Sequence, residues 1–90
     1  MKADRKQVER LLKTAKGQID GVLKMIEDDK YCIDIVNQIL ASQAILNKAS
    51  KEILVAHIDG CVSDSFSSND ETFQKEKMEE LKMVIDKLAK

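Results

Sequence analysis

Three side chains that are good ligands for a soft metal ion lie in the middle of this 90-residue chain. They are Cys32, His57 and Cys61, the only two cysteines and the only histidine of the sequence. His57 and Cys61 are four residues apart, and positions i and i+4 of an α-helix lie on one face, one turn apart. A thiolate and an imidazole placed in this way can hold one soft cation.

The third ligand, Cys32, lies 25 residues before His57. If one helix carries both residues, a rise of 1.5 Å per residue separates them by about 37 Å. Cys32 therefore cannot join the His57 of its own chain, but it can join the His57 of a second, antiparallel copy. The spacing predicts a metal site that is shared across a dimer.

The composition favours a single all-α domain that covers residues 1–90. The sequence has no proline, three glycines, 3% aromatic residues and 34% charged residues, which suits long helices better than a sheet. No run approaches about 18 consecutive apolar residues, so no membrane span is expected. The first ten residues lack the apolar stretch of a signal peptide, so we expect a cytoplasmic protein whose cysteines are ligands or redox centres. We find no catalytic constellation, and therefore expect neither an enzyme nor a small-molecule substrate.

The apolar periodicity predicts three helices. We expect them from about Asp4 to about Glu27, from Tyr31 or Cys32 to about Ser63, and from about Asp70 to the end. Gly17 and Gly21 are four apart in the first helix, which would permit close approach of another helix. A central helix of about 30 residues cannot bury its apolar stripe between two shorter neighbours. We therefore expect two protomers to pair antiparallel along their long helices and to form a four-helix core.

Charge is unevenly distributed, although the net charge is only −1. Residues 1–16 contain six basic side chains and two acidic ones. A basic stripe on one helix can neutralise phosphates even when the whole chain is slightly acidic. An ordinary solvated helix face has the same pattern, so charge alone leaves both interpretations open.

Two long runs, LLKTAKGQIDGVLKMIEDDKYCIDIVNQILASQAIL and AHIDGCVSDSF, resemble the CsoR/RcnR family of bacterial metal-sensing repressors. The resemblance covers residues 8–88. It implies an all-helical homodimer that assembles into a homotetramer as a dimer of dimers. It also implies a protein that binds operator DNA without metal and leaves the DNA when the inducer binds.

The same resemblance assigns roles to individual residues. Cys32 with His57 and Cys61 of the partner chain matches the ligand set of the copper branch, which would hold one Cu(I). Tyr31 and Glu80 match residues that support the ligands, with Glu79 as an alternative to Glu80. Leu11, Thr14 and Asp20 stand where arginines are expected, so the phosphate contacts would fall to Arg10, Lys13, Lys16 and Lys48.

The sequence thus predicts a Cu(I)-responsive repressor, and two alternatives stay open. One is a persulfide-sensing repressor in which Cys32 and Cys61 of opposite chains join through sulfur, although that branch of the family lacks the histidine. The other is a cytosolic copper buffer that has lost its operator, because lysine cannot offer the bidentate contacts of arginine.

Overall fold

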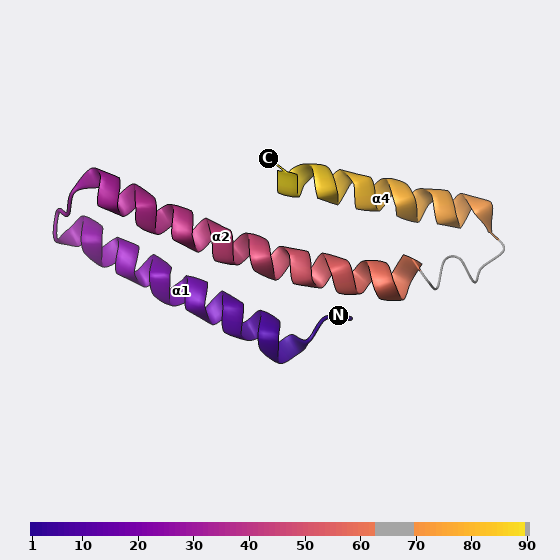
Figure 1. Cartoon of the computed structure of the whole chain (residues 1–90), viewed down its shortest axis with the longest axis horizontal. Helices are drawn as coiled ribbons and strands as arrows, with labels where there is room; N and C mark the ends of the chain where they lie inside the picture. The colour runs from indigo at the N-terminus through magenta and orange to yellow at the C-terminus, as the bar shows by residue number, and fades with distance from the viewer. Residues whose placement is uncertain (63–69, 90) are drawn as a thin grey trace. The chain divides into compact units, whose positions relative to one another are not determined.

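The structure, a computed structural model, describes residues 1–62 and 70–89. This part of the chain consists of helix α1 (Arg5–Glu27), helix α2 (Cys32–His57), a π-helical turn η1 (Ile58–Val62) and helix α4 (Glu71–Ala89), as Figure 1 shows. These residues contain no strand, which confirms the prediction of an all-α fold with a long central helix. None of the described helices is long and apolar enough to cross a membrane. The residues form two compact units, Asp4–Glu52 on one hand and Met1–Ala3 with Ile53–Lys90 on the other.

Side-chain and backbone caps fix both ends of α1 where the sequence predicted them. The carboxylate of Asp4 accepts hydrogen bonds from the backbone N–H groups of Lys6 (3.1 Å) and Gln7 (3.4 Å). At the other end the backbone N–H of Lys30 donates to the carbonyl of Met25 at 2.9 Å. Asp29 adopts a left-handed conformation with φ of 52° and donates to Ile26 at 3.1 Å, which completes a Schellman motif.

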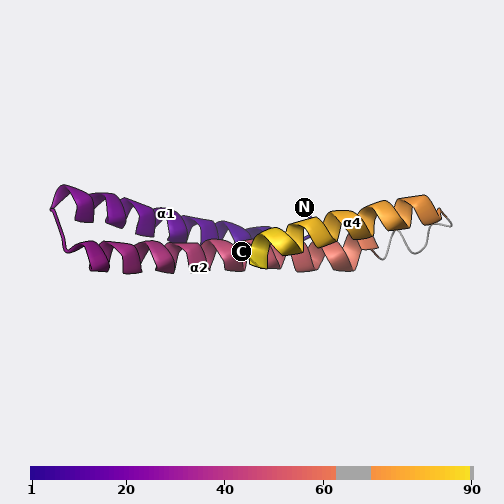
Figure 2. The ribbon, with the colours of Figure 1, turned by 90° about the horizontal axis from the view of Figure 1, so that it is seen from above.

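Helices α1 and α2 form an antiparallel hairpin within the unit Asp4–Glu52, and the two helices lie side by side in both views (Figures 1 and 2). Their buried and half-buried residues recur at alternating steps of three and four, the pattern of a coiled-coil seam. The seam consists of Val8, Leu11, Ala15, Gln18, Val22 and Met25 on α1 and of Ile35, Gln38, Ser42, Ile45, Ala49 and Glu52 on α2. At its open end Nε2 of Gln7 donates to Oε1 of Glu52 at 3.5 Å, which fixes the level of the two helices.

Further apolar side chains of the hairpin face outward in the single chain. The exposed set includes Leu12, Ile19, Leu23 and Ile26 on α1 and Ile33, Val36, Ile39, Leu40 and Leu46 on α2. Added β-carbons at Gly17 and Gly21 would meet nothing within 4 Å. The close helix approach that we predicted at these glycines therefore does not occur within the described chain.

The C-terminal end of α2 differs from the prediction. The sequence suggested a continuous α-helix to about Ser63, but the α-helix ends at His57 and the chain continues as the π-helical turn η1. Ser63 itself and the loop before Asp70 lie outside the described residues. The last helix begins at Glu71, close to the predicted start, and the carboxylate of the preceding Asp70 accepts from the N–H groups of Thr72 (3.0 Å) and Phe73 (3.2 Å). α4 packs against η1, and its Leu81 is buried.

Candidate metal centre

Cys32 is the first residue of α2, where its side chain is a free, exposed thiol. The preceding residue, Tyr31, holds the start of the helix because its carbonyl accepts from the N–H of Ile35 at 3.2 Å. The phenol ring of Tyr31 is exposed, so its backbone has a structural role while its side chain remains available. The exposed Cys32 sulfur is therefore accessible to a soft metal ion.

His57 is the last residue of α2, and its side chain is half-buried. Cys61 follows in η1; the structure describes its backbone but not its side chain. The two ligands are therefore joined by a π-helical turn with i→i+5 hydrogen bonds rather than by the α-helical turn that we assumed. π-Helical turns are rare in proteins as a whole, and those that do occur are often found at functional sites.

Gly60, between these two ligands, is covered by the beginning of the chain. A β-carbon at this position would lie 3.0 Å from Cδ and Cε of Lys2. The aliphatic part of Lys2 thus packs on the backbone of η1. The absence of a side chain at residue 60 is what gives Lys2 this room.

The described part of one chain does not assemble a metal centre by itself. Among these residues no three His, Cys, Asp or Glu side chains come together in an arrangement that could hold a metal ion. Cys32 and His57 are the first and last residues of one unbroken helix. Any site that uses both residues must therefore take one of them from a second copy.

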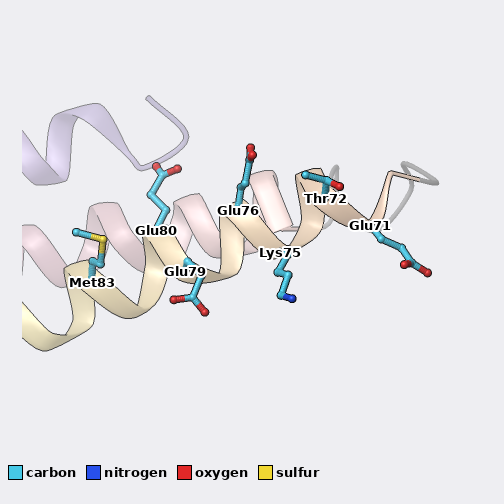
Figure 3. Close-up of a pocket in the computed structure, with 7 residues that line it drawn as sticks. All are labelled: Glu71, Thr72, Lys75, Glu76, Glu79, Glu80 and Met83. Carbon is cyan, nitrogen blue, oxygen red and sulfur yellow. The ribbon is translucent and has the colours of Figure 1, made fainter.

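The two glutamates proposed to support the ligands lie on α4, which packs against η1. Both are exposed, and each pairs with a lysine of its own helix: Glu80 with Lys77 at 3.6 Å and Glu79 with Lys82 at 3.4 Å. Figure 3 shows Glu76 and Glu80 pointing to one side of α4 and Glu79 to another. At most one of the two neighbouring glutamates can therefore face a given ligand, and neither forms a hydrogen bond with His57 within the described residues.

The predicted DNA-contacting residues are all exposed. Arg10 and Lys13 line a shallow depression on α1 together with Lys6, Glu9 and Thr14. Lys16 lies further along α1, outside that depression. Sequence reasoning did not select Lys6, although its spacing of four from Arg10 and seven from Lys13 already places it on the same helix face.

Lys48 belongs to the other helix of the hairpin. It lies one turn before Glu52 on α2, and Leu11 lies one turn after Gln7 on α1. Because Gln7 bonds to Glu52, Lys48 is level with Leu11, which follows Arg10 in the sequence. The hairpin thus brings Lys48 of α2 to the same level as the basic residues at the start of α1.

Comparison with known proteins identifies the family. The family described as "Metal-sensitive transcriptional repressor" matches residues 4–87. The chain belongs to this family. The copper-sensing transcriptional repressor CsoR of Bacillus subtilis is 37% identical over 67 residues, which cover 74% of this chain and 66% of that protein. CsoR of Mycobacterium ulcerans is 42% identical over 52 residues, which cover 58% of this chain and 44% of that protein.

Solved structures of metal-responsive transcriptional regulators have the same fold. The copper-sensing repressor CsoR with Cu(I) from Geobacillus thermodenitrificans matches with a TM-score of 0.80 and 38% identity, over 94% of this chain and 85% of that one. The nickel-responsive regulator InrS matches with a TM-score of 0.76, but its identity of 22% supports the fold alone. The chain spans less than two thirds of the length of the two curated relatives described above. Membership in a family of transcriptional repressors agrees with the expectation that this chain is not an enzyme.

Proposed function

We propose that this metal-sensitive repressor is a cytoplasmic Cu(I) sensor that binds operator DNA in its metal-free form and releases it when Cu(I) binds. Cu(I) would be held by Cys32 of one protomer and by His57 and Cys61 of its antiparallel partner. Two such dimers would form a homotetramer. The copper-sensing relatives support the choice of metal.

The observation that carries the proposal is a second seam on the outer face of α2. Starting at Cys32 and ending at His57, eight residues recur at alternating steps of four and three: Cys32, Val36, Ile39, Gln43, Leu46, Ser50, Ile53 and His57. All except His57 are exposed in the single chain. A seam of this length and period, with apolar side chains at Val36, Ile39, Leu46 and Ile53, suits pairing with another helix.

This seam is symmetric under antiparallel self-pairing. If Cys32 of one copy faces His57 of the other, then Val36 faces Ile53 and Ile39 faces Ser50 in the same register. A two-fold axis would lie between Gln43 and Leu46, which face each other across it. The register that buries the apolar positions is thus also the register that brings the ligands together, at both ends of the paired helices.

The donor set fits Cu(I). Two thiolates and one imidazole are soft ligands, and Cu(I) accepts low coordination numbers. Zinc would need a fourth ligand, and the chain has only one histidine for metals that favour several imidazoles. The metal would connect the start of one α2 helix to the end of its partner, and the bound form would hold the basic side chains of α1 in a different arrangement toward DNA. By linkage, operator DNA must then weaken Cu(I) binding by the same factor as Cu(I) weakens DNA binding.

A subunit-mixing experiment tests the shared site. Cys32→Ser and His57→Asn variants should each bind Cu(I) poorly as homodimers. A mixed dimer contains one intact site, so equal mixing with random pairing should restore roughly a quarter of the wild-type sites. X-ray absorption of the wild-type protein, titrated anaerobically, should show two sulfur ligands and one nitrogen ligand for each Cu(I). If the mixture binds no more Cu(I) than the two variants do separately, a site shared in this way is ruled out.

Two further measurements separate the alternatives. His57→Asn should abolish Cu(I) binding, whereas a persulfide sensor that joins Cys32 to Cys61 would keep its response in this variant. Gel-shift titration with DNA from upstream of the operon tests the repressor against a copper buffer, since a buffer would show no binding even at low salt.

In a repressor, Lys6→Gln should reduce the salt slope of DNA binding by about 0.9 if Lys6 contacts one phosphate.

A further inference from the structure

A buried oxygen without a donor lies in the middle of the α1–α2 hairpin. Oε1 of Gln18 is covered by protein, and no hydrogen-bond donor of the described residues reaches it. Buried polar atoms in folded proteins almost always have a partner. The hairpin therefore holds one acceptor that its present arrangement leaves unused.

Gln18 occupies a position of the hairpin seam, where a coiled coil normally has an apolar side chain. Its neighbours across the seam follow from the bond between Gln7 and Glu52. Gln18 lies eleven residues after Gln7 on α1, and Ala41 lies eleven residues before Glu52 on α2. Gln18 is therefore level with Ala41 and Ser42, and the unused acceptor shares a layer of the seam with a serine hydroxyl.

Ser42 is the one buried polar residue of the described part of the chain, at 5% exposure. Its hydroxyl donates to the carbonyl of Gln38 in its own helix at 3.3 Å, which is a long hydrogen bond. That carbonyl belongs to an α-helix and already accepts from the backbone. A serine hydroxyl has a single proton and three staggered orientations, so it serves either this carbonyl or a second acceptor such as Gln18.

The backbone around Gln18 is easily adjusted. Gly17 and Gly21 lie beside it and one turn away, and neither packs against any other part of the described chain. Glycines in a helix interior lower the stability of the helix locally. This part of α1 follows the basic stripe, and it faces the helix that carries Cys32 and His57.

We propose that Gln18 and Ser42 form a two-position hydrogen-bond switch between α1 and α2. In the described position the Ser42 hydroxyl donates to Gln38; in the second position it donates to Oε1 of Gln18. The second position draws α1 toward α2 at this layer and changes the placement of the basic stripe. As a link between metal and DNA, the switch rests on the proposed function, but its two positions exist in the hairpin whatever the ligand.

The switch itself can be tested without metal or DNA, by amide hydrogen exchange of the full-length protein. Gln18→Met removes the unused acceptor and keeps the length of the side chain, so amides of residues 15–22 should exchange about tenfold more slowly. Gln7→Met at the open end of the hairpin should not protect them. Ser42→Ala should change exchange in the wild-type background, yet have no added effect in Gln18→Met. Unchanged exchange in Gln18→Met, or additive effects of the two substitutions, would overturn the switch.

The link to regulation has its own measurement, the ratio of operator Kd values with and without Cu(I). Gln18→Met and Ser42→Ala should each reduce this ratio by about tenfold, and the double variant should reduce it no further. Thr72→Val is the control, because it removes an exposed hydroxyl on α4 that belongs neither to the hairpin seam nor to the basic depression of α1. It should leave the ratio unchanged. If the wild-type protein binds no DNA, the proposed function fails, and the hydrogen-exchange result still decides whether the switch exists. If the wild-type protein responds to Cu(I) but neither variant alters the ratio of Kd values, the link between the switch and regulation is wrong.

Discussion

Glu79 and Glu80 are adjacent on α4, but they leave the helix in different directions, and only one can support the proposed metal centre (Figure 3). The ion pairs that both form with lysines of the same helix are exposed, and such pairs contribute little to stability. Either carboxylate is therefore free to exchange its lysine for the N–H of a coordinating imidazole. A carboxylate in that role fixes the orientation of the ring and raises its basicity.

We predict that Glu80→Gln lowers the Cu(I) affinity by about tenfold, the loss typical of a group that orients a metal-bound histidine. Glu79→Gln is the matched control, one residue away on the same exposed helix, and should retain wild-type affinity. Competition with a Cu(I) chelator under anaerobic conditions measures both. If the two variants exchange these results, the supporting residue is Glu79.

Asp29 is the described non-glycine residue with a positive φ, and it terminates α1. Asparagine and aspartate tolerate this conformation better than other residues, but glycine adopts it without a steric cost. Asp29→Gly should therefore raise the free energy of unfolding by up to about 1 kcal/mol in urea denaturation. Asp28→Gly, where φ is −83°, should instead lower it by about 0.5–1 kcal/mol. A destabilised Asp29→Gly would show that the aspartate side chain has a role of its own in this turn.

At the scale of whole elements, α1 contains two glycines whose sites have room for a side chain. Because added β-carbons would meet nothing within 4 Å, Gly17→Ala and Gly21→Ala should each stabilise the protomer by about 0.5–1 kcal/mol. Gly60→Ala is the contrasting case, since its β-carbon would displace Lys2 from 3.0 Å and should gain less. Urea denaturation compares all three. A loss of stability at Gly17 or Gly21 would reveal a second copy packed on that face of α1.

The starts of α1 and α4 were predictable because Asp4 and Asp70 are residues whose carboxylates cap helices locally. The end of α2 was not predictable in the same way. Gly60 signals a weak point, but nothing in the local sequence distinguishes a π-helical turn from a last α-helical one. The change matters for the site, because it decides how His57 and Cys61 are joined.

The sequence also could not predict which apolar residues of α1 pack against α2 and which stay exposed. Val8 and Ala15 are buried against α2 while Leu12 and Ile19 are exposed, although all four follow the same helical period. Both stripes are apolar, so periodicity shows that the helix has partners but not which stripe meets which partner. The three proposed metal ligands, by contrast, were selected by residue type and spacing, and their role stays a prediction. Cys32 and His57 lie on one helix, as we expected, but His57 is its last residue and not an interior one.

At the scale of the whole molecule, the proposed site needs a second copy, so the proposal links copper affinity to self-association. Leu46 lies next to the proposed two-fold axis and is 39% exposed in the single chain. Leu46→Glu would place a charge in each half of the α2–α2 seam, and burial of an unpaired charge is costly. All three ligands remain intact in this variant.

We therefore expect Leu46→Glu to shift the protein to monomers in sedimentation equilibrium. Its Cu(I) affinity should fall at least about tenfold, because in a monomer Cys32 and the His57–Cys61 pair cannot bind the same metal ion. Lys51→Glu is the control: it introduces the same side chain on an exposed part of α2 outside the seam and should change neither property. Raising the protein concentration should partly restore Cu(I) binding to Leu46→Glu, since mass action favours the dimer. Full Cu(I) affinity in a monomeric variant would contradict a shared site, because the remaining ligands would then have to come from one chain.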